Sequence, residues 1–359
     1  IQWQSSTTSA TSGFTNISGA TSAAYSNASA LTATTYFRAK VKSGVCDSTY
    51  SNAVTVTVNP ASVGGTVGRD TTVCTGSNSA LLTLSGKVGS VVKWQSSTSS
   101  DFSTGVTDLF DTVTTRTVTD LSTTTYYRVQ VKNGVTPAAY STVATITVSQ
   151  PSQGGTVSGS TTVCTGTNRT KLTLSGYEGL IQWQSSADNI QFNNVINASD
   201  DSLIVANLGQ TMYYRALVQS GVCAGAYSDT ATVTVSPATV SGAASGDTTV
   251  CASANSSVIT LNGYVGSIQW QVSSDSSNFS AISGATNATY TASGLTATRY
   301  YRARVKSGVC DSLFSNTVTI TVDPASVGGS IAGSSTVCTG TNSTVLVLSG
   351  RTGNVIGWQ

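Results

Sequence analysis

Histidine is absent from this chain of 359 residues, and glutamate occurs once, at Glu178. Without histidine the chain lacks the side chain that most often serves as a general base or a neutral metal ligand near pH 7. Charged residues make up only 9% of the sequence, against roughly 25% in ordinary soluble domains. The net charge of +2 provides no basic field for nucleic acid. We therefore expect no catalytic residues, no bound metal, no cofactor and no nucleic-acid partner.

Long apolar runs are also missing: none approaches the roughly 20 residues that a membrane helix needs. The first residues, Ile-Gln-Trp-Gln, do not resemble a signal peptide, so we expect any targeting or anchoring segment to lie outside these 359 residues. Serine and threonine are abundant, at about a third of the chain, and 34 glycines accompany them. Hydrophobic residues still make up 39%, which favours a folded chain over a disordered one.

The chain repeats one unit with a period near 88 residues. The repeated landmarks are the tryptophans Trp3, Trp94, Trp183, Trp270 and Trp358, a Val-Cys pair ending at Cys74, Cys164, Cys251 and Cys338, and an aromatic pair before Arg38, Arg128, Arg215 and Arg302. This period is too long for the common solenoid repeats and fits one small β-sandwich per period. Prolines mark the joints and predict the domains 1–60, 61–150, 151–237, 238–324 and 325–359, of which the first and last are partial.

Within each unit, apolar and polar residues alternate with a period of two. Tyr214, Ala216 and Val218 are expected to face inward while Arg215 and Leu217 face outward. Such alternation is typical of antiparallel sheets with one face in water and one face on a core. No segment shows the pattern of an amphipathic helix. Half a sandwich cannot bury its own sheet, so we expect the two partial units to pair with chain outside residues 1–359 or with another copy.

The spacing across the joints is constant. Residues 46 and 74, 136 and 164, 223 and 251, and 310 and 338 are each 28 positions apart. A flexible tether tolerates insertions, so a fixed spacing that includes proline favours a set angle between domains. Recent duplication without divergence explains the spacing equally well.

The run Val163-Cys164-Thr165-Gly166, followed by Leu-Thr-Leu-Ser-Gly, Ile-Gln-Trp-Gln, Tyr-Tyr-Arg-Ala, Ser-Gly-Val-Cys and Thr-Val-Thr-Val, resembles the immunoglobulin-like repeats of giant Bacteroidetes cell-surface adhesins. The gliding-motility adhesin of flavobacteria is the most similar of these. The resemblance implies an all-β fold of tandem immunoglobulin- or fibronectin-III-like sandwiches in an elongated array. It also implies export by the gliding-linked outer-membrane secretion machinery, display at the cell surface, and a role as a stalk or filament.

Seven cysteines without histidine favour disulfides over zinc or cysteine–histidine chemistry. Pairing within a unit joins Cys164 to Cys223 and Cys251 to Cys310. Cys74 is then unpaired, because Thr136 occupies its partner's position, and Cys46 and Cys338 find no partner among these residues.

Pairing across a joint would instead join Cys46 to Cys74, Cys223 to Cys251 and Cys310 to Cys338, leaving Cys164 alone. A strand of about ten residues separates Cys223 from Cys251 and carries the chain some 30 Å away, whereas bridged Cα atoms lie within about 7 Å. The geometry therefore favours pairing within units. The pairing across a joint and an intermolecular bridge stay open.

Three surface features are candidates for binding or modification. Outward Arg and Lys side chains form a basic stripe that could engage anionic polysaccharide, although solvated edge charges explain it more simply. The tryptophans could stack on sugars, but their aliphatic neighbours favour the core. Asp followed by Ser or Thr resembles the O-glycosylation signal of exported Bacteroidetes proteins and predicts glycans on Ser48, Thr71, Thr112, Ser202, Thr230, Thr248 and Ser312. Ordinary turn chemistry is the alternative.

The sequence as a whole predicts the non-catalytic shaft of a secreted adhesin or filament, whose partners are neighbouring repeats and other shafts. The alternative is an array that binds extracellular polysaccharide directly, or the accessory repeats of a secreted glycosidase.

Overall fold

The computed structural model describes residues 1–252 and 254–359, and every regular element in them is a β-strand. These residues contain no helix long and apolar enough to cross a membrane. The contacts divide the chain into two compact units, 1–153 together with 219–226, and 154–218 together with 227–359. The short segment 219–226 belongs to the third repeat by sequence and yet packs in the first unit.

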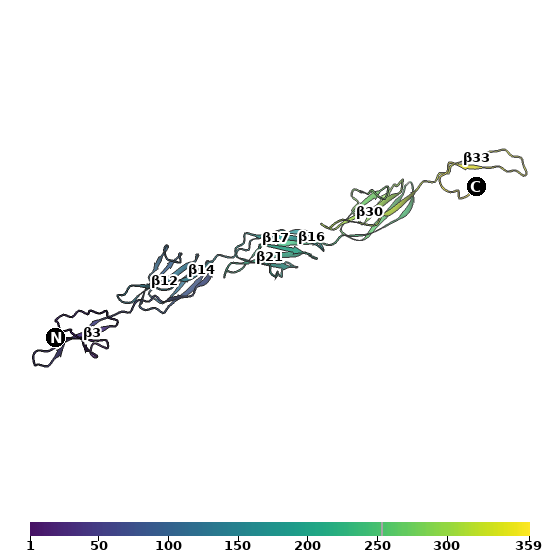
Figure 1. Cartoon of the computed structure of the whole chain (residues 1–359). Coiled ribbons are helices and arrows are strands. Elements are labelled where there is room, and N and C mark those ends of the chain that lie inside the picture. The colour runs from purple at the N-terminus through teal and green to yellow at the C-terminus, as the bar shows by residue number, and fades with distance from the viewer. Residues whose placement is uncertain (253) are drawn as a thin grey trace. The chain divides into compact units, whose positions relative to one another are not determined.

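The second repeat, 61–150, is a sandwich of two sheets. The larger sheet orders its strands β10 (Thr107–Leu109), β9 (Ser90–Ser97), β12 (Thr125–Lys132), β14 (Ala144–Ser149) and β7 (Thr71–Cys74), with β13 (Ala139–Tyr140) on β12. The smaller sheet orders β11 (Thr115–Thr119), β8 (Ser79–Ser85) and β6 (Thr66–Gly68). Figure 1 shows β12 and β14 as neighbours in this sandwich.

The third and fourth repeats have the same two sheets. The larger sheet of the third contains β16 (Thr161–Cys164), β23 (Ala231–Ser236), β21 (Met212–Gln219), β18 (Leu180–Ser186), β19 (Asn193–Asn194) and β22 (Ala226–Tyr227), and its smaller sheet contains β15 (Thr156–Ser158), β17 (Arg169–Ser175) and β20 (Ser202–Ala206). In the fourth, the corresponding strands are β25 (Thr248–Cys251), β32 (Val318–Asp323), β30 (Arg299–Lys306), β27 (Ser267–Ser273), β28 (Ser280–Ala281) and β31 (Leu313–Phe314), then β24 (Val240–Ser245), β26 (Ser256–Val265) and β29 (Thr289–Ser293).

Each complete repeat has its own core between its two sheets. Trp94, Trp183 and Trp270 are fully buried there, and aliphatic residues from both sheets surround them. The indole N–H of Trp183 donates to the carbonyl oxygen of Asp200 at 2.8 Å, which satisfies its one polar group inside the core. The burial of Tyr214, Ala216 and Val218 confirms the inward face predicted from the alternation.

One strand pair in each complete repeat departs from the antiparallel expectation. The strand that ends in Val-Cys lies parallel to the last strand of its own repeat: β7 beside β14, β16 beside β23 and β25 beside β32. The register places Cys74 opposite Ser149 and Cys164 opposite Ser236. Each of these cysteines therefore lies where its repeat ends and the next begins.

The two end segments each contain part of a sandwich. Residues 1–60 form a single five-stranded sheet of β2 (Thr15–Asn16), β1 (Gln2–Ser6), β3 (Thr35–Val41), β4 (Thr49–Tyr50) and β5 (Val54–Val56). Residues 325–359 contain the two-stranded pair β33 (Ser330–Ala332) and β34 (Val347–Ser349).

Candidate functional site: the joints between repeats

A four-residue turn lies at the start of each joint. We call it the joint turn; it comprises residues 43–46, 133–136, 220–223 and 307–310, directly after the central strand of each larger sheet. In three of the four copies it meets the preceding repeat. The backbone N–H groups of Asn133, Ser220 and Ser307 donate to hydroxyl oxygens just past the joint proline, on Ser62, Ser152 and Thr239 respectively, at 2.9–3.0 Å.

The glycine of the joint turn lies against the last strand of the preceding repeat. Gly221 and Gly308 have φ of 52° and 48°, a left-handed conformation that glycine adopts without strain. A Cβ on either would lie only 2.1–2.2 Å from the Oγ of Ser149 or Ser236. Gly44 has the same conformation but has open space around it. Glycine is therefore required at this position both by the turn and by the close approach of the neighbouring repeat.

Disulfides close two of these joints. Cys74 at the end of β7 bonds to Cys223 in the joint turn of the third repeat, and Cys164 at the end of β16 bonds to Cys310 in that of the fourth. Cys223 and Cys310 are only 3% and 4% exposed. The sulfur of Cys223 also lies 3.2 Å from the carbonyl oxygen of Gln150. Each bond links the exit of one repeat to the entry of the next.

The predicted pairing within units, Cys164 with Cys223 and Cys251 with Cys310, is wrong, and so is the pairing between SGVC and the following Val-Cys. Cys74, expected to be unpaired, is bonded, whereas Cys251, expected to be bonded, is an exposed free thiol like Cys46 and Cys338. The parallel strand explains the error. It carries the Val-Cys cysteine to the exit end of the sandwich, while the joint turn sits at the entry end, about 20 Å away along a six-residue strand.

The joint before the second repeat has hydroxyl groups in place of a disulfide. Thr136 stands at the cysteine position, and its Oγ1 lies 2.7 Å from the Oγ of Ser62. The Nδ2 of Asn133 donates to the carbonyl oxygen of Pro60 at 2.9 Å. The same contact surface is therefore kept without a covalent bond.

A second recurring cluster lies on the outer face of each larger sheet. In all four sheets an arginine guanidinium stacks between two aromatic rings, which we call the arginine stack. The triplets are Phe14–Arg38–Tyr50, Phe102–Arg128–Tyr140, Phe192–Arg215–Tyr227 and Phe279–Arg302–Phe314, with 3.9–4.1 Å from each guanidinium carbon to each ring centroid. Such cation–π contacts hold a cation over the electron-rich ring face.

Each arginine stack also satisfies a buried glutamine. The Nε of Arg215 donates to the Oε1 of Gln184 at 3.0 Å, and the Nε2 of Gln184 donates to Asn194 at 2.9 Å. Arg128, Gln95 and Asp108 repeat this chain in the second repeat. The predicted basic stripe is thus no row of free charges at its arginines, because these side chains are half-buried and bonded across three strands. The phenylalanines carried no recognisable sequence signal.

Residues 1–60, 63–150, 153–237 and 240–324 each match one protein family, described as "Domain of unknown function (DUF8696)". The chain belongs to this family. No curated protein matches it in sequence. The family repeats are tandem immunoglobulin-like sandwiches, and their joints and arginine stacks recur with the family unit.

Solved structures with a similar arrangement are all distant in sequence. A structure of three immunoglobulin domains of titin is 14% identical and matches 71% of this chain and 95% of its own, with a TM-score of 0.46. A structure of a 1.5-MDa bacterial ice-binding adhesin is 13% identical, over 71% and 94%, at 0.33. The FN1 to FN3 domains of chicken CNTN1 are 13% identical, over 74% and 99%, at 0.25. These values bear on the fold alone.

The remaining candidates lie as follows. In the part of the chain that the structure describes, no three His, Cys, Asp or Glu side chains gather as metal ligands would. The three fully buried tryptophans, Trp94, Trp183 and Trp270, cannot stack on a sugar. The seven hydroxyl residues expected to carry glycans are all at least partly exposed. Several of the preceding aspartates have structural roles: those of Asp70, Asp229 and Asp247 accept bonds from strand N–H groups.

Proposed function

We propose that this chain is the load-bearing shaft of a protein displayed outside the cell. The observation that carries the proposal is that both disulfides cross joints and none of the bonded cysteines pairs within a repeat. A disulfide inside a sandwich would stabilise one domain, whereas a disulfide between sandwiches restrains the angle and the separation of two domains. Disulfides also persist chiefly in oxidising, extracellular surroundings.

The crossed disulfides shorten the covalent path on which a pulling force acts. From residue 1 the path runs to Cys74, crosses to Cys223, runs backwards to Cys164, crosses to Cys310 and continues to residue 359. It comprises about 181 residue steps, whereas the reduced chain has about 358. At about 3.3–3.6 Å per residue, full extension is about 600 Å oxidised and about 1,200 Å reduced.

Single-molecule pulling of the full chain by its two ends tests this proposal. We expect a final extension of about 600 Å without reductant and about 1,200 Å with it. A double variant, Cys74→Ser with Cys164→Ser, should extend to the longer value under both conditions, while Cys338→Ser should behave as the unaltered chain. An oxidised extension of about 800 Å would fit bonds within repeats and would remove the basis of the proposal.

The proposal includes a bacterial cell-surface setting. The resemblance to Bacteroidetes adhesin repeats supports secretion, outer-membrane association and a role in gliding or surface adhesion. Cells treated with an external protease should lose the protein if it is displayed, and the protein should remain intact until lysis if it is not.

The outer ring of the arginine stack favours one alternative function. Tyr50, Tyr140 and Tyr227 expose one ring face, which could stack on a polysaccharide. Binding of the oxidised chain to a glycan array, lost in a Tyr140→Ala, Tyr227→Ala double variant, would favour this alternative. Absence of binding would favour a passive shaft.

We also propose O-glycosylation of the Asp-Ser/Thr sites, because their hydroxyl groups lie on a surface with few charges to keep it hydrated. The intact mass of protein from the native cell should exceed that of the polypeptide. A mass equal to the 36.5 kDa polypeptide would eliminate glycans and leave the aspartates with turn chemistry alone.

A further inference from the structure

The sheet formed by residues 1–60 has an apolar face without a covering sheet. Val54 and Val56 are 53% and 44% exposed, whereas Ala144 and Ile146, at the same register positions of the second repeat, are both 0% exposed. In the second repeat the covering is supplied by β6 and β8 of the smaller sheet. An apolar face of this kind is normally buried against another layer.

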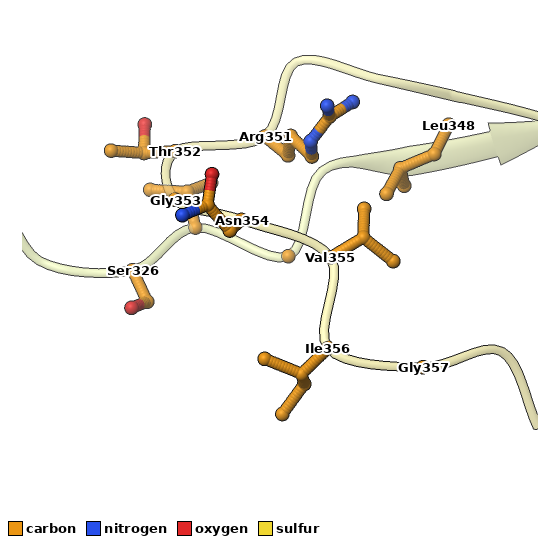
Figure 2. Close-up of a pocket in the computed structure, with 11 residues that line it drawn as sticks. Ser326, Leu348, Arg351, Thr352, Gly353, Asn354, Val355, Ile356 and Gly357 are labelled. Atoms are coloured by element: carbon orange, nitrogen blue, oxygen red, sulfur yellow. The ribbon is translucent and has the colours of Figure 1, made fainter.

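The strands that would cover this face exist at the other end of the chain. The pair β33–β34 has the register of β6–β8: Ile331 lies opposite Leu348 as Val67 lies opposite Leu84. Leu346 is 50% exposed although its equivalent Leu82 is 0% exposed. Figure 2 shows Leu348, Val355 and Ile356 around an open hollow of this segment. The C-terminal segment is therefore half a sandwich with its inner side uncovered.

Backbone pairing is incomplete in both end segments at matching places. In the second repeat β8 pairs along Ser79–Ser85 with β11, Thr115–Thr119. The equivalents of these strands are residues 343–349 and 25–29, of which only 347–349 form a strand. The missing partner of each segment has the sequence position of the other. Exposed, unpaired strand edges readily accept another strand.

We propose that the C-terminal segment 325–359 of one molecule docks on the N-terminal sheet 1–60 of a second copy, so that the two halves complete one sandwich between the molecules. Residues 325–355 supply β33 and β34, and residues 1–60 supply the strands of the larger sheet. The two segments overlap only at the tryptophan strand, where Ile-Gly-Trp-Gln at 356–359 duplicates Ile-Gln-Trp-Gln at 1–4.

The free cysteines fit the same arrangement independently. Within the chain, the Val-Cys cysteine of one repeat bonds to the joint turn of the next. If the completed sandwich follows the fourth repeat, its joint turn is residues 43–46 of the second copy, which brings Cys46 to Cys251. Both are exposed free thiols. Cys338 would face the second copy's Thr136 and stay reduced.

Formation of that bond needs an oxidant, for which a small-molecule disulfide such as oxidised glutathione suffices. The thiols of Cys46 and Cys251 each lose one proton and one electron, the S–S bond forms, and the small disulfide is reduced to two thiols. A second copy can dock without bending either disulfide-bridged joint, whereas closure of one chain on itself would have to bend both.

The test uses the full chain with oxidised glutathione, and its readouts are sedimentation velocity and disulfide mapping by mass spectrometry. We expect species that grow with concentration and a Cys46–Cys251 peptide, with Cys338 alkylated as a free thiol. Hydrogen exchange should slow at residues 25–29 and 343–346 on assembly. Monomers at every concentration, or a Cys46–Cys251 bond found within monomers, would overturn the proposal.

Two variants separate the two surfaces. Leu346→Asp disables the C-terminal half and Val56→Asp the N-terminal half, and each alone should leave monomers. An equimolar mixture should yield dimers and nothing larger, because each dimer has one intact pair of halves and two disabled ends. Leu81→Asp, an exposed apolar position of a complete repeat, is the matched control and should assemble fully. Assembly of both single variants alone would contradict the proposal even if all chains fold.

Discussion

Cys164 and Cys310 lie 146 residues apart in sequence, and their Cα atoms are 4.9 Å apart across a joint. The parallel pairing of β16 with β23 brings the first to the exit of its repeat, and the joint turn brings the second to the entry of the next. The constant 28-residue spacing then has a physical role, because it spans the last strand, the joint and the parallel strand that together fix the next cysteine.

Removal of one joint cysteine should affect its own bond alone. In a Cys46→Ser background, which keeps the chain monomeric, thiol titration should find two free cysteines, and Cys223→Ser should add a third, Cys74. The Cys164–Cys310 peptide should remain. We expect the unfolding free energy to fall by about 2–5 kcal/mol, measured by urea denaturation. Loss of both bonds in this variant would show that the joints are not independent.

Alanine at the joint-turn glycine should open the joint. Gly308→Ala combines an unfavourable φ of 48° with a Cβ 2.2 Å from the Oγ of Ser236, so we expect slower formation of the Cys164–Cys310 bond during oxidative refolding. Gly44→Ala is the matched control, since it has the same φ sign and open space. Its effect should be limited to the backbone strain of about 1 kcal/mol. Equal effects of the two substitutions would mean that joint contact does not matter.

The repeated sandwich could be predicted from sequence because period-two alternation and the tryptophan spacing report directly on burial. The disulfides could not, because the partners are set by one parallel strand pair, and four residues such as Thr161–Cys164 carry no signal for parallel or antiparallel pairing. The arginine stack was missed for a related reason. Phe192 and Tyr227 lie on either side of Arg215 in space but 23 and 12 residues from it in sequence.

The arginine stack should contribute to the stability of its own repeat. Arg215→Ala removes two ring contacts and leaves the buried amide of Gln184 without its donor, for which we expect a loss of about 1–3 kcal/mol. Arg215→Lys should recover only part, because an ammonium lacks the planar stack. Arg169→Ala, an exposed arginine of the same repeat, should change stability by less than about 0.5 kcal/mol. Urea unfolding of the three variants checks this order.

Acid should weaken the turn that presents the aromatic ring to each stack. The backbone N–H groups of Ile190 and Gln191, with the hydroxyl of Ser186, lower the pKa of Asp188, and the hydroxyl of Ser99 leads the groups that lower the pKa of Asp101 to about 2. A carboxyl whose pKa is lower in the folded state stabilises the fold above its unfolded pKa, near 4, and loses this effect as the pH falls through the folded value. Stability should therefore decline from about pH 4 to about pH 2. Asp188→Asn should be less stable than the unaltered chain at pH 7 and should approach it at about pH 2, as measured by thermal unfolding across this range. Parallel stability curves for the two proteins would contradict this role of the carboxylate.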